Sequence, residues 1–311
     1  MEINPSNQRL SIPHFQAIKK ERVQIWPYYY LAPALIIFSI FLFFPLFKTL
    51  QISLYNWNLI SPNRTFVGLD NYLSLIVSPN FWKIVWQSVL YMIAALLGNF
   101  LFPLVLALLT TRFSDLEAGL YQSLIFVPTV VPVSIGALIW LWIYLPTGGP
   151  LSVISLALFK TPLTWLNDPS FALWAVAIVT TWKFMGFNYL FLLAGLKAIP
   201  KSFLEAAKLD GAKGWRLQGK IILPLLTPTL LFVFLTTILQ ALDNSFVPIQ
   251  ILTLGGPVGS TTHLLFGIYQ DGFRFFRAGQ ASAMAVVSLL FLAGAIIWQF
   301  RLLDQKVNYE R

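Results

Sequence analysis

The sequence is short of charge. Aspartate, glutamate, lysine and arginine together account for 11% of the 311 residues, whereas a soluble domain carries about 25%. Cysteine is absent, which excludes disulfides and thiolate metal sites, and the histidines are limited to His14 and His263. With so few candidate nucleophiles and ligands, we expect no catalytic residues and no bound metal in this chain.

Hydrophobic residues make up 57% of the chain and gather in long runs. A helix needs about 20 apolar residues to cross roughly 30 Å of hydrocarbon. Six stretches meet this requirement, at about 28–47, 84–109, 121–144, 171–194, 221–242 and 281–300. Lys183 carries the one charge among them. The sequence therefore predicts an all-α polytopic membrane protein, with six transmembrane helices in one domain over residues 28–301.

The net charge of +9 is distributed unevenly. Most lysines and arginines fall in the tails 1–27 and 302–311 and in connections on the same side, including loop 197–220. The connections on the other side carry Arg64, Lys83, Lys160, Arg274 and Arg277. Because cytoplasmic loops are enriched in basic residues, both termini and loop 197–220 are expected in the cytoplasm. The N-terminal tail lacks the apolar core of a signal peptide, so the first span is expected to be an uncleaved anchor.

Two pairs of prolines interrupt the expected spans. Pro128 and Pro132 lie in the third, and Pro224 and Pro228 in the fifth. A proline inside a helix removes a hydrogen bond and kinks the helix, and neighbouring helices can satisfy the freed groups. We expect kinks here, although prolines are also simply commoner in transmembrane helices.

The expected outer connections contain turn signals. The run FVGLDNY at 66–72 predicts a turn followed by a short interfacial helix, and Gly-Gly-Pro occurs at 148–150 and again at 255–257. The segment after the second Gly-Gly-Pro is too polar to span and rich in aromatic residues. It is expected to lie at the outer interface or to pack into the bundle.

Loop 197–220 contains a short predicted helix. Ser202 and Glu205 have the spacing of a capping box, and Gly211 suits the left-handed residue that ends a helix. The helix is expected over about 203–209. So short a helix is marginal alone and needs a docking partner.

The side chains of this helix suit a protein contact. Ala206 and Ala207 have little bulk and would allow close approach, while Phe203, Leu204, Leu209 and Trp215 offer apolar anchors. An ordinary short helix beneath the membrane is the alternative. The nearby segment Gly214–Lys220 matches the start of a phosphate-binding loop, G-x4-G-K, but Ile221 stands where serine or threonine should hold magnesium. Any ATP chemistry must therefore come from another chain.

The loop resembles the EAA loop of permease subunits in binding-protein-dependent ABC importers. The surrounding sequence is similar to the carbohydrate branch, the larger-subunit type of maltose and glycerol-3-phosphate uptake systems. The EAA spacing consists of Glu205, Ala206, Ala207, Gly211, Ile221, Leu223 and Pro224. The supporting runs are FVGLDNY (66–72), LYQSLIFVPTVVP (120–132), TWKFMGFNYLFLLAGLKAIPKSFLEAAKLDGA (181–212), ILPLLTPTL (222–230) and TLGGP (253–257). The resemblance covers about residues 26–308, and Gln218 departs from it where an aromatic is usual.

The resemblance implies a type I ABC importer permease bundle in a bacterial inner membrane. It implies a coupling helix that sits in a cleft of a cytoplasmic ATPase and makes its contacts through Ser202, Phe203, Leu204, Glu205, Ala206, Ala207, Asp210, Gly211 and Trp215. Two ATPase copies, a second permease subunit and an extracytoplasmic solute-binding protein would complete the system. ATP and magnesium would be bound by the ATPase, with no cofactor in this chain.

Polar residues within the spans are candidates for the solute path. Lys183 should face the bundle interior, because a charge at that depth costs about 2.5–3.5 kcal/mol. The candidates are Trp182, Lys183, Asn188, Gln240, Asp243 and Asn244. Gln240, Asp243 and Asn244 share one helix side. Lys183 could instead be a structural partner of a carbonyl, and Asp243 and Asn244 could simply mark the end of the fifth span.

These observations predict a permease subunit for a sugar, glycoside, polyol or glycerol phosphate. The alternative is a stand-alone ion- or proton-coupled secondary carrier. Such a carrier would need acidic residues within the membrane for a proton relay, and the expected spans have none.

Overall fold

The computed structural model describes residues 26–304. The chain divides into two units, Met1–Lys48 and Thr49–Arg311. The described part of the first unit consists of α1 (Trp26–Phe38), a π-helical turn (Ser39–Phe43) and the start of α2 (Phe44–Ile52). These elements form one apolar helix at the position of the first expected span, and no residue of its most apolar window is buried within the chain.

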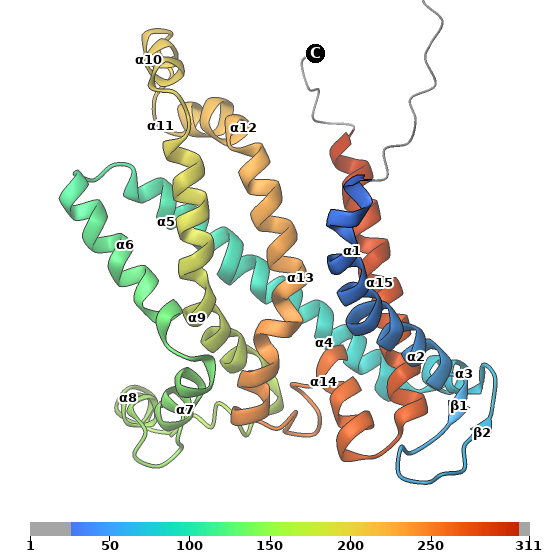
Figure 1. Cartoon of the computed structure of the whole chain (residues 1–311). Coiled ribbons are helices and arrows are strands. Elements are labelled where there is room, and N and C mark those ends of the chain that lie inside the picture. The colour runs from blue at the N-terminus through green and yellow to red at the C-terminus, as the bar shows by residue number, and fades with distance from the viewer. Residues whose placement is uncertain (1–25, 305–311) are drawn as a thin grey trace, which may run out of the picture. The chain divides into compact units, whose positions relative to one another are not determined.

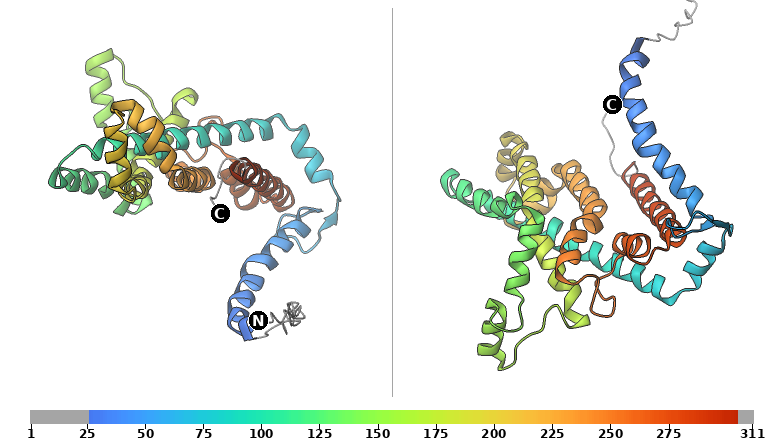
Figure 2. Two further views of the ribbon diagram at one scale, coloured as in Figure 1. Left: turned by 90° about the horizontal axis from the view of Figure 1, so that it is seen from above. Right: turned by 60° about the horizontal axis from the view of Figure 1, so that its bottom comes forward.

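The second unit is almost entirely helical (Figures 1 and 2). Its α-helices are α3 (Asp70–Val77), α4 (Pro79–Ala95), α5 (Phe102–Thr110), α6 (Asp115–Val130), α7 (Val133–Ile143), α8 (Pro150–Phe159), α9 (Pro169–Lys197), α10 (Lys201–Leu209), α11 (Gly214–Leu217), α12 (Leu223–Leu225), α13 (Thr227–Leu252), α14 (Leu264–Tyr269) and α15 (Ala278–Asp304). Its π-helical turns are Leu96–Leu101, Gln218–Ile222 and Gln270–Arg274. Figure 1 shows α10 and α11 at one end of this unit and α7, α8 and α14 at the other.

The membrane character of the chain is confirmed, and four or five of the six expected spans meet the length and hydropathy criteria among the described residues. In the described part of the chain, four helices are long and apolar enough to cross a membrane: Tyr29–Ile52, Pro79–Thr110, Pro169–Lys197 and Thr227–Leu252. The pair Leu116–Val130 and Val133–Ile143 makes a fifth if it is counted as one broken span. At the sixth position α15 (Ala278–Asp304) has 27 residues, and its stretch Ala278–Gly294 is apolar.

The first proline pair produces the predicted kink. Pro128 lies inside α6, Pro132 precedes α7, and the two helices meet at 96°. Because Pro132 has no N–H, it cannot continue the helical hydrogen-bond ladder. The second pair flanks a break at Leu226, which separates α12 from α13.

Helix α9 is the centre of the second unit and packs against α4, α5, α6, α7 and α13. Gly186 permits the close approach of α6, because a Cβ built at this position would lie 2.6 Å from the carbonyl oxygen of Ile125. Asp168 caps the start of α9 by accepting a hydrogen bond from the Ser170 N–H at 2.8 Å. Gly186 thus lets the backbones of α6 and α9 lie in direct contact.

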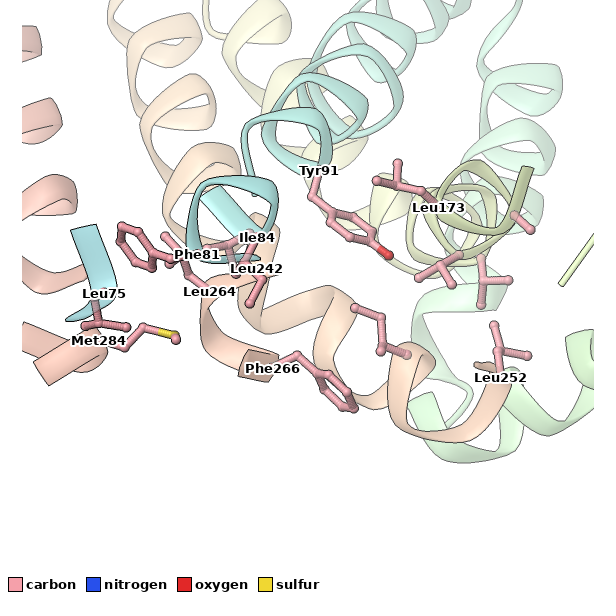
Figure 3. Close-up of a cluster of buried hydrophobic side chains, with 14 of the residues drawn as sticks. Leu75, Phe81, Ile84, Tyr91, Leu173, Leu242, Leu252, Leu264, Phe266 and Met284 are labelled. Atoms are coloured by element: carbon pink, nitrogen blue, oxygen red, sulfur yellow. The ribbon is translucent and has the colours of Figure 1, made fainter. Parts of the chain in front are cut away.

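Two apolar cores lie along α9. The larger joins α4, α9, α13 and α14, and its side chains are drawn in Figure 3, among them Tyr91, Leu173, Leu242 and Phe266. The smaller core lies nearer to α10, where Tyr189 and Leu192 pack against Leu226 and Val233. Along α9, Lys183 lies between the residues of the larger core and those of the smaller core.

The segment from Thr253 to His263 packs into the bundle rather than lying on its surface. Thr261 and His263 are fully buried. The Thr261 hydroxyl donates to the Gly256 carbonyl at 2.9 Å, and the Gln87 amide of α4 donates to the Gly259 carbonyl at 2.9 Å. The part from Thr261 to Phe266 thus packs into the bundle, whereas Val258 and Phe273 remain exposed.

The FVGLDNY run forms the predicted turn and helix. Gly68 has a φ of +57°, and α3 begins at Asp70. A two-residue antiparallel ribbon precedes it, with β1 (Tyr55–Asn56) paired to β2 (Thr65–Phe66). Asn71 fixes the ribbon by donating to the carbonyl oxygen of Tyr55 at 3.0 Å.

Candidate functional site

The loop helix α10 runs from Lys201 to Leu209 and ends as predicted at a left-handed glycine. Gly211 has a φ of +82°. The Ala212 N–H donates to the Ala207 carbonyl at 2.9 Å, and the Gly211 N–H donates to the Lys208 carbonyl at 3.1 Å. This pair of bonds is a Schellman motif, which satisfies the last carbonyls of the helix.

The capping box predicted at Ser202 and Glu205 is wrong. The N-cap of α10 is Pro200, and no side chain caps this end. Since the helix already starts at Lys201, Ser202 lies inside its first turn and cannot take the N-cap position. A capping box does occur at the start of α6, where Ser114 and Glu117 bond to each other in both directions.

The surface of α10 is divided into an inner and an outer side. Ala207 is buried and Leu204 is half-buried. Phe203 and Leu209 are 57% and 90% exposed, and Trp215 after the helix is 87% exposed. Ser202, Glu205, Ala206, Asp210 and Gly211 are also exposed. Of the two alanines expected to admit a partner, only Ala206 is therefore accessible.

The segment resembling a phosphate-binding loop is helical. Residues Gly214–Leu217 form α11, and Gln218–Ile222 form a π-helical turn. A phosphate-binding loop needs consecutive backbone N–H groups that open toward the ligand. In this segment those groups belong to helical turns.

A second set of predicted residues meets in a cavity between α6, α9 and α13. The cavity has a volume of about 250 Å³. It brings together four of the predicted solute-path residues, Lys183, Asn188, Gln240 and Asn244. The residues that sequence reasoning missed are Asn99, Thr129, Phe184, Phe187 and Thr237.

Lys183 connects the cavity to the break between α6 and α7. Its side chain is 7% exposed, and its Nζ donates to the Thr129 carbonyl oxygen at 2.5 Å. The last carbonyls of a helix have no partner within it, and a cation at this end also interacts favourably with the helix dipole. Lys183 therefore stabilises the C-terminal end of α6 while it lines the cavity.

Asn188 connects α9 to α13 and to the π-helical turn Leu96–Leu101. Its Nδ2 donates to the Asn99 carbonyl at 2.5 Å and to the Thr237 hydroxyl at 3.1 Å. The Asn99 Oδ1 and Thr129 Oγ1 atoms are buried without a hydrogen-bond partner among the described residues. Buried polar atoms of this kind usually have a partner, so a solute hydroxyl or a water would satisfy them.

Two predicted solute-path residues lie elsewhere. Trp182 lines a separate apolar groove with Trp140 and Trp174. Asp243 is exposed and does not line the cavity. The fifth span also does not end at Asp243 and Asn244, because α13 continues to Leu252. The polar side chains of Asp243 and Asn244 do not end the helix, because the backbone hydrogen bonds of α13 continue past them.

The missed residues had weak signals in the sequence. Thr129 lies between Pro128 and Pro132, so a freed carbonyl near it could be foreseen. Asn99 is a single amide in an apolar run, and the π-helical turn that surrounds it has no pattern of its own. Among residues 26–304 there is no group of three or more histidine, cysteine, aspartate or glutamate side chains that could hold a metal.

Residues 104–309 match the family model of the binding-protein-dependent transport system inner membrane component. The chain belongs to this family. It is a permease subunit of a binding-protein-dependent ABC importer, as predicted, and the alternative of a stand-alone secondary carrier is set aside.

The permease is similar to curated relatives over nearly its whole length. It is 31% identical over 288 residues to the sn-glycerol-3-phosphate transport system permease protein UgpA of Agrobacterium fabrum, with 92% of this chain and 97% of the relative covered. It is 31% identical over 284 residues to the Escherichia coli protein of the same description, with 91% and 96% covered.

Solved structures show the same fold. One chain from the crystal structure of a bacterial ABC transporter that imports the acidic polysaccharide alginate matches with a TM-score of 0.79 at 21% identity, covering 91% of this permease and 97% of that chain. A second, from the alginate transporter in complex with an alginate pentasaccharide-bound periplasmic protein, matches with a TM-score of 0.76 at 22% identity, covering 88% and 93%. The predicted type I ABC importer permease fold is confirmed.

Proposed function

We propose that this permease forms half of the path for a small polyhydroxylated solute, and that the cavity between α6, α9 and α13 contacts it. The solute class comprises sugars, glycosides, polyols and glycerol phosphates. Amides, hydroxyls and aromatic rings line the cavity, and these groups bind hydroxylated solutes by hydrogen bonds and stacking. No aspartate or glutamate is among the lining residues.

The unused hydrogen-bonding capacity of the cavity carries the proposal. The side chains of Gln240 and Asn244 make no hydrogen bond to the rest of the described chain, and Asn99 Oδ1 and Thr129 Oγ1 are buried without a partner. Leaving a buried atom such as Asn99 Oδ1 or Thr129 Oγ1 unpaired costs about 1–3 kcal/mol. A passing solute with several hydroxyls would recover part of that cost.

Among these solutes we favour a glycerol phosphate. Lys183 places a cation in a cavity without lining carboxylates, which suits an anion. The relatives from Agrobacterium fabrum and Escherichia coli carry the description sn-glycerol-3-phosphate transport system permease protein. Lys183 can also donate to neutral hydroxyls, so neutral polyols are included in the test below.

The exposed side of α10 is proposed as the contact for a cytoplasmic ATPase. Phe203, Leu209 and Trp215 are large exposed apolar side chains of α10 and α11. These two helices lie at one end of the second unit (Figure 1), and exposed apolar patches mark protein contacts. The proposed coupling loop also includes Ser202, Leu204, Glu205, Ala206, Asp210 and Gly211. Ala207 belongs to the same loop but is buried beneath its surface.

The proposed assembly contains a second permease subunit, two ATPase copies and an extracytoplasmic binding protein. ATP and magnesium would bind to the ATPase, while this chain itself would carry no catalysis and no cofactor. Both termini and loop 197–220 are proposed to lie in the cytoplasm, because basic residues are concentrated there. ATP binding drives transport in this scheme because the ATPase pair binds two arrangements of the bundle with different affinity.

The test is ATP-dependent uptake by the reconstituted transporter with its binding protein. Gln240→Leu and Asn244→Leu should raise the KM for glycerol 3-phosphate by about tenfold, the effect of one lost hydrogen bond of about 1.4 kcal/mol. Thr236→Val is the matched control, because it removes a polar group from α13 outside the cavity. Unchanged uptake kinetics in both leucine variants would contradict the role of the cavity. Uptake that persists without the ATPase would contradict the proposed coupling.

A further inference from the structure

A second cavity, of about 460 Å³, lies between α10 and the ends of α5 and α9. We call it the loop cleft. Arg112 reaches it from the connection after α5, Lys208 from α10, and Gln218 from the π-helical turn Gln218–Ile222. It is separate from the solute cavity, with which it shares no lining residue.

The polar part of the loop cleft is positively charged. Arg112 and Lys208 come from two different elements and line the same space, and no aspartate or glutamate lines it with them. Within the described residues, neither side chain forms an ion pair or hydrogen bond that would neutralise it. Two uncompensated cations around one cavity favour an anion between them.

The remaining walls of the loop cleft are apolar. Leu204 and Leu217 face it from the loop, and Leu196, Ile199 and Ile222 complete the wall. A small soluble anion would leave this apolar surface in contact with water. An amphiphile with an anionic head and a hydrocarbon chain would cover both parts.

Gln218 lies on the wall of the loop cleft. The sequence departs at this position from the aromatic residue that is usual in loops of this kind, and the structure places Gln218 on the cleft wall. A glutamine side chain is smaller than a phenylalanine or tyrosine ring. A ring at this position would therefore leave less space in the cleft.

We propose that the loop cleft binds an anionic phospholipid, with its phosphate between Arg112 and Lys208 and the start of its acyl chain against the apolar wall. The lining residues of the cleft come from the ends of α5 and α9, from the connections that follow them, and from α10. Basic pockets between transmembrane helices on the cytoplasmic side are suited to lipid headgroups of this charge. The proposal rests on the cytoplasmic placement of loop 197–220 given above.

The lipid would connect α10 to the bundle. Lys208 belongs to α10 and Arg112 does not, so a phosphate shared by them bridges the coupling helix and the connection between α5 and α6. A short helix gains most of its stability from such contacts. Anionic lipid is therefore expected to increase solute-stimulated ATPase activity.

The experiment measures lipid retained by the complete transporter in native mass spectrometry. The transporter is taken from bilayers of phosphatidylcholine with or without phosphatidylglycerol. The double variant R112Q/K208Q should retain phosphatidylglycerol about thirtyfold less well, because each of the two basic residues near the lipid contributes about 1 kcal/mol. K201Q/R216Q changes two basic residues of the same loop that do not line the cleft, and should retain the lipid as the unmodified protein does.

Gln218→Phe gives an independent test, because it fills the cleft and keeps both cations. It should also lose the lipid, and lipid-dependent ATPase stimulation should disappear with it. Retention of lipid by both Gln218→Phe and R112Q/K208Q would overturn the proposal. The proposal would also be overturned if inorganic phosphate stimulated the ATPase as strongly as phosphatidylglycerol does, since the ligand would then be a soluble anion. Normal ATP-dependent uptake in the same preparation shows that such a failure concerns the loop cleft alone.

Discussion

The Lys183 ammonium donates a hydrogen bond to the carbonyl oxygen of Thr129, 54 residues earlier in the chain, at 2.5 Å. The bond to a carbonyl is the structural role that the sequence left open, and Lys183 also lines the cavity proposed for the solute. It stabilises the end of a helix broken by proline, and it places a cation on the wall of the solute cavity. The same ammonium group therefore holds the end of α6 and supplies the positive charge of the cavity.

Replacing Lys183 should affect both stability and uptake. Lys183→Met leaves the Thr129 carbonyl without its partner, which costs about 1–3 kcal/mol, so thermal unfolding of the purified transporter should begin at a lower temperature. Uptake of glycerol 3-phosphate should fall more than uptake of a neutral polyol. Lys197→Met, at the exposed end of the same helix, is the control and should change neither. Equal losses for both solutes would make Lys183 purely structural.

Gly186 should tolerate no side chain. A methyl group there would meet the carbonyl oxygen of Ile125 and the hydroxyl of Thr129, both at 2.6 Å. Gly186→Ala should destabilise the packing of α6 on α9 by about 1–3 kcal/mol, measured as a lower thermal unfolding midpoint. The same substitution at Gly119 of α6, where nothing lies within 4 Å, should be neutral. An unaltered midpoint for Gly186→Ala would show that the two helices can separate freely.

Gly211→Pro should uncouple transport from ATP hydrolysis. Proline fixes φ near −65°, whereas Gly211 has a φ of +82°, so the Schellman motif cannot form. We expect normal membrane insertion, with ATPase activity that no longer responds to the loaded binding protein. Gly219→Ala in the same loop has an open position for its Cβ and should couple normally. Coupling retained in the proline variant would separate α10 from ATPase docking.

The exposed apolar side chains at α10 should bind the ATPase. Trp215→Ser and Leu209→Ser remove surfaces that are 87% and 90% exposed, so they should reduce co-purification of the ATPase without reducing the stability of the permease. Val258→Ser removes an 83% exposed side chain at the opposite end and is the control. Undiminished co-purification with both Trp215→Ser and Leu209→Ser would place the docking surface elsewhere.

The buried His263 predicts a dependence of stability on pH. Burial lowers the pKa of His263 to about 3, below its ordinary 6.5. The unfolded chain therefore binds a proton that the folded chain cannot, so stability is constant above about pH 6.5 and decreases as the pH falls below it. Between pH 6.5 and pH 5 the loss should be about 2 kcal/mol.

His263→Asn is the matched variant for this pH dependence. Asparagine can still accept the bond that His263 Nδ1 takes from the Phe266 N–H, but it does not titrate. The difference in unfolding midpoint between pH 7.5 and pH 5 should therefore be smaller in the variant. An equal difference in both proteins would assign the effect to other groups.

Hydropathy correctly predicted that the chain is a membrane protein. A span needs about 20 consecutive apolar residues, and such a run can be read directly from the sequence. Proline chemistry likewise predicted the break after Pro128, and the conformation of glycine predicted the end of α10 at Gly211. Each of these predictions depends on one residue type and its neighbours along the chain.

The sequence could not show which candidate residues lie together, because contacts between distant segments decide this. Lys183 and Trp182 are adjacent in sequence, yet a helix turns about 100° per residue, and the two line different cavities. Asp243 was expected at the end of a span because it is charged, but α13 continues through it. The partners of Asn99 and Thr129 come from other helices, so their part in the cavity could be seen only in three dimensions.

Asp243 has a consequence for how this subunit is turned within the membrane. It is an exposed carboxylate inside the span Thr227–Leu252, and no residue in the described part of the chain bonds to its side chain. A charge at the middle of a span that faces hydrocarbon costs about 2.5–3.5 kcal/mol or more. The flank of α13 that bears Asp243 must therefore face water or another protein, and the lipid must lie on a different side of the subunit.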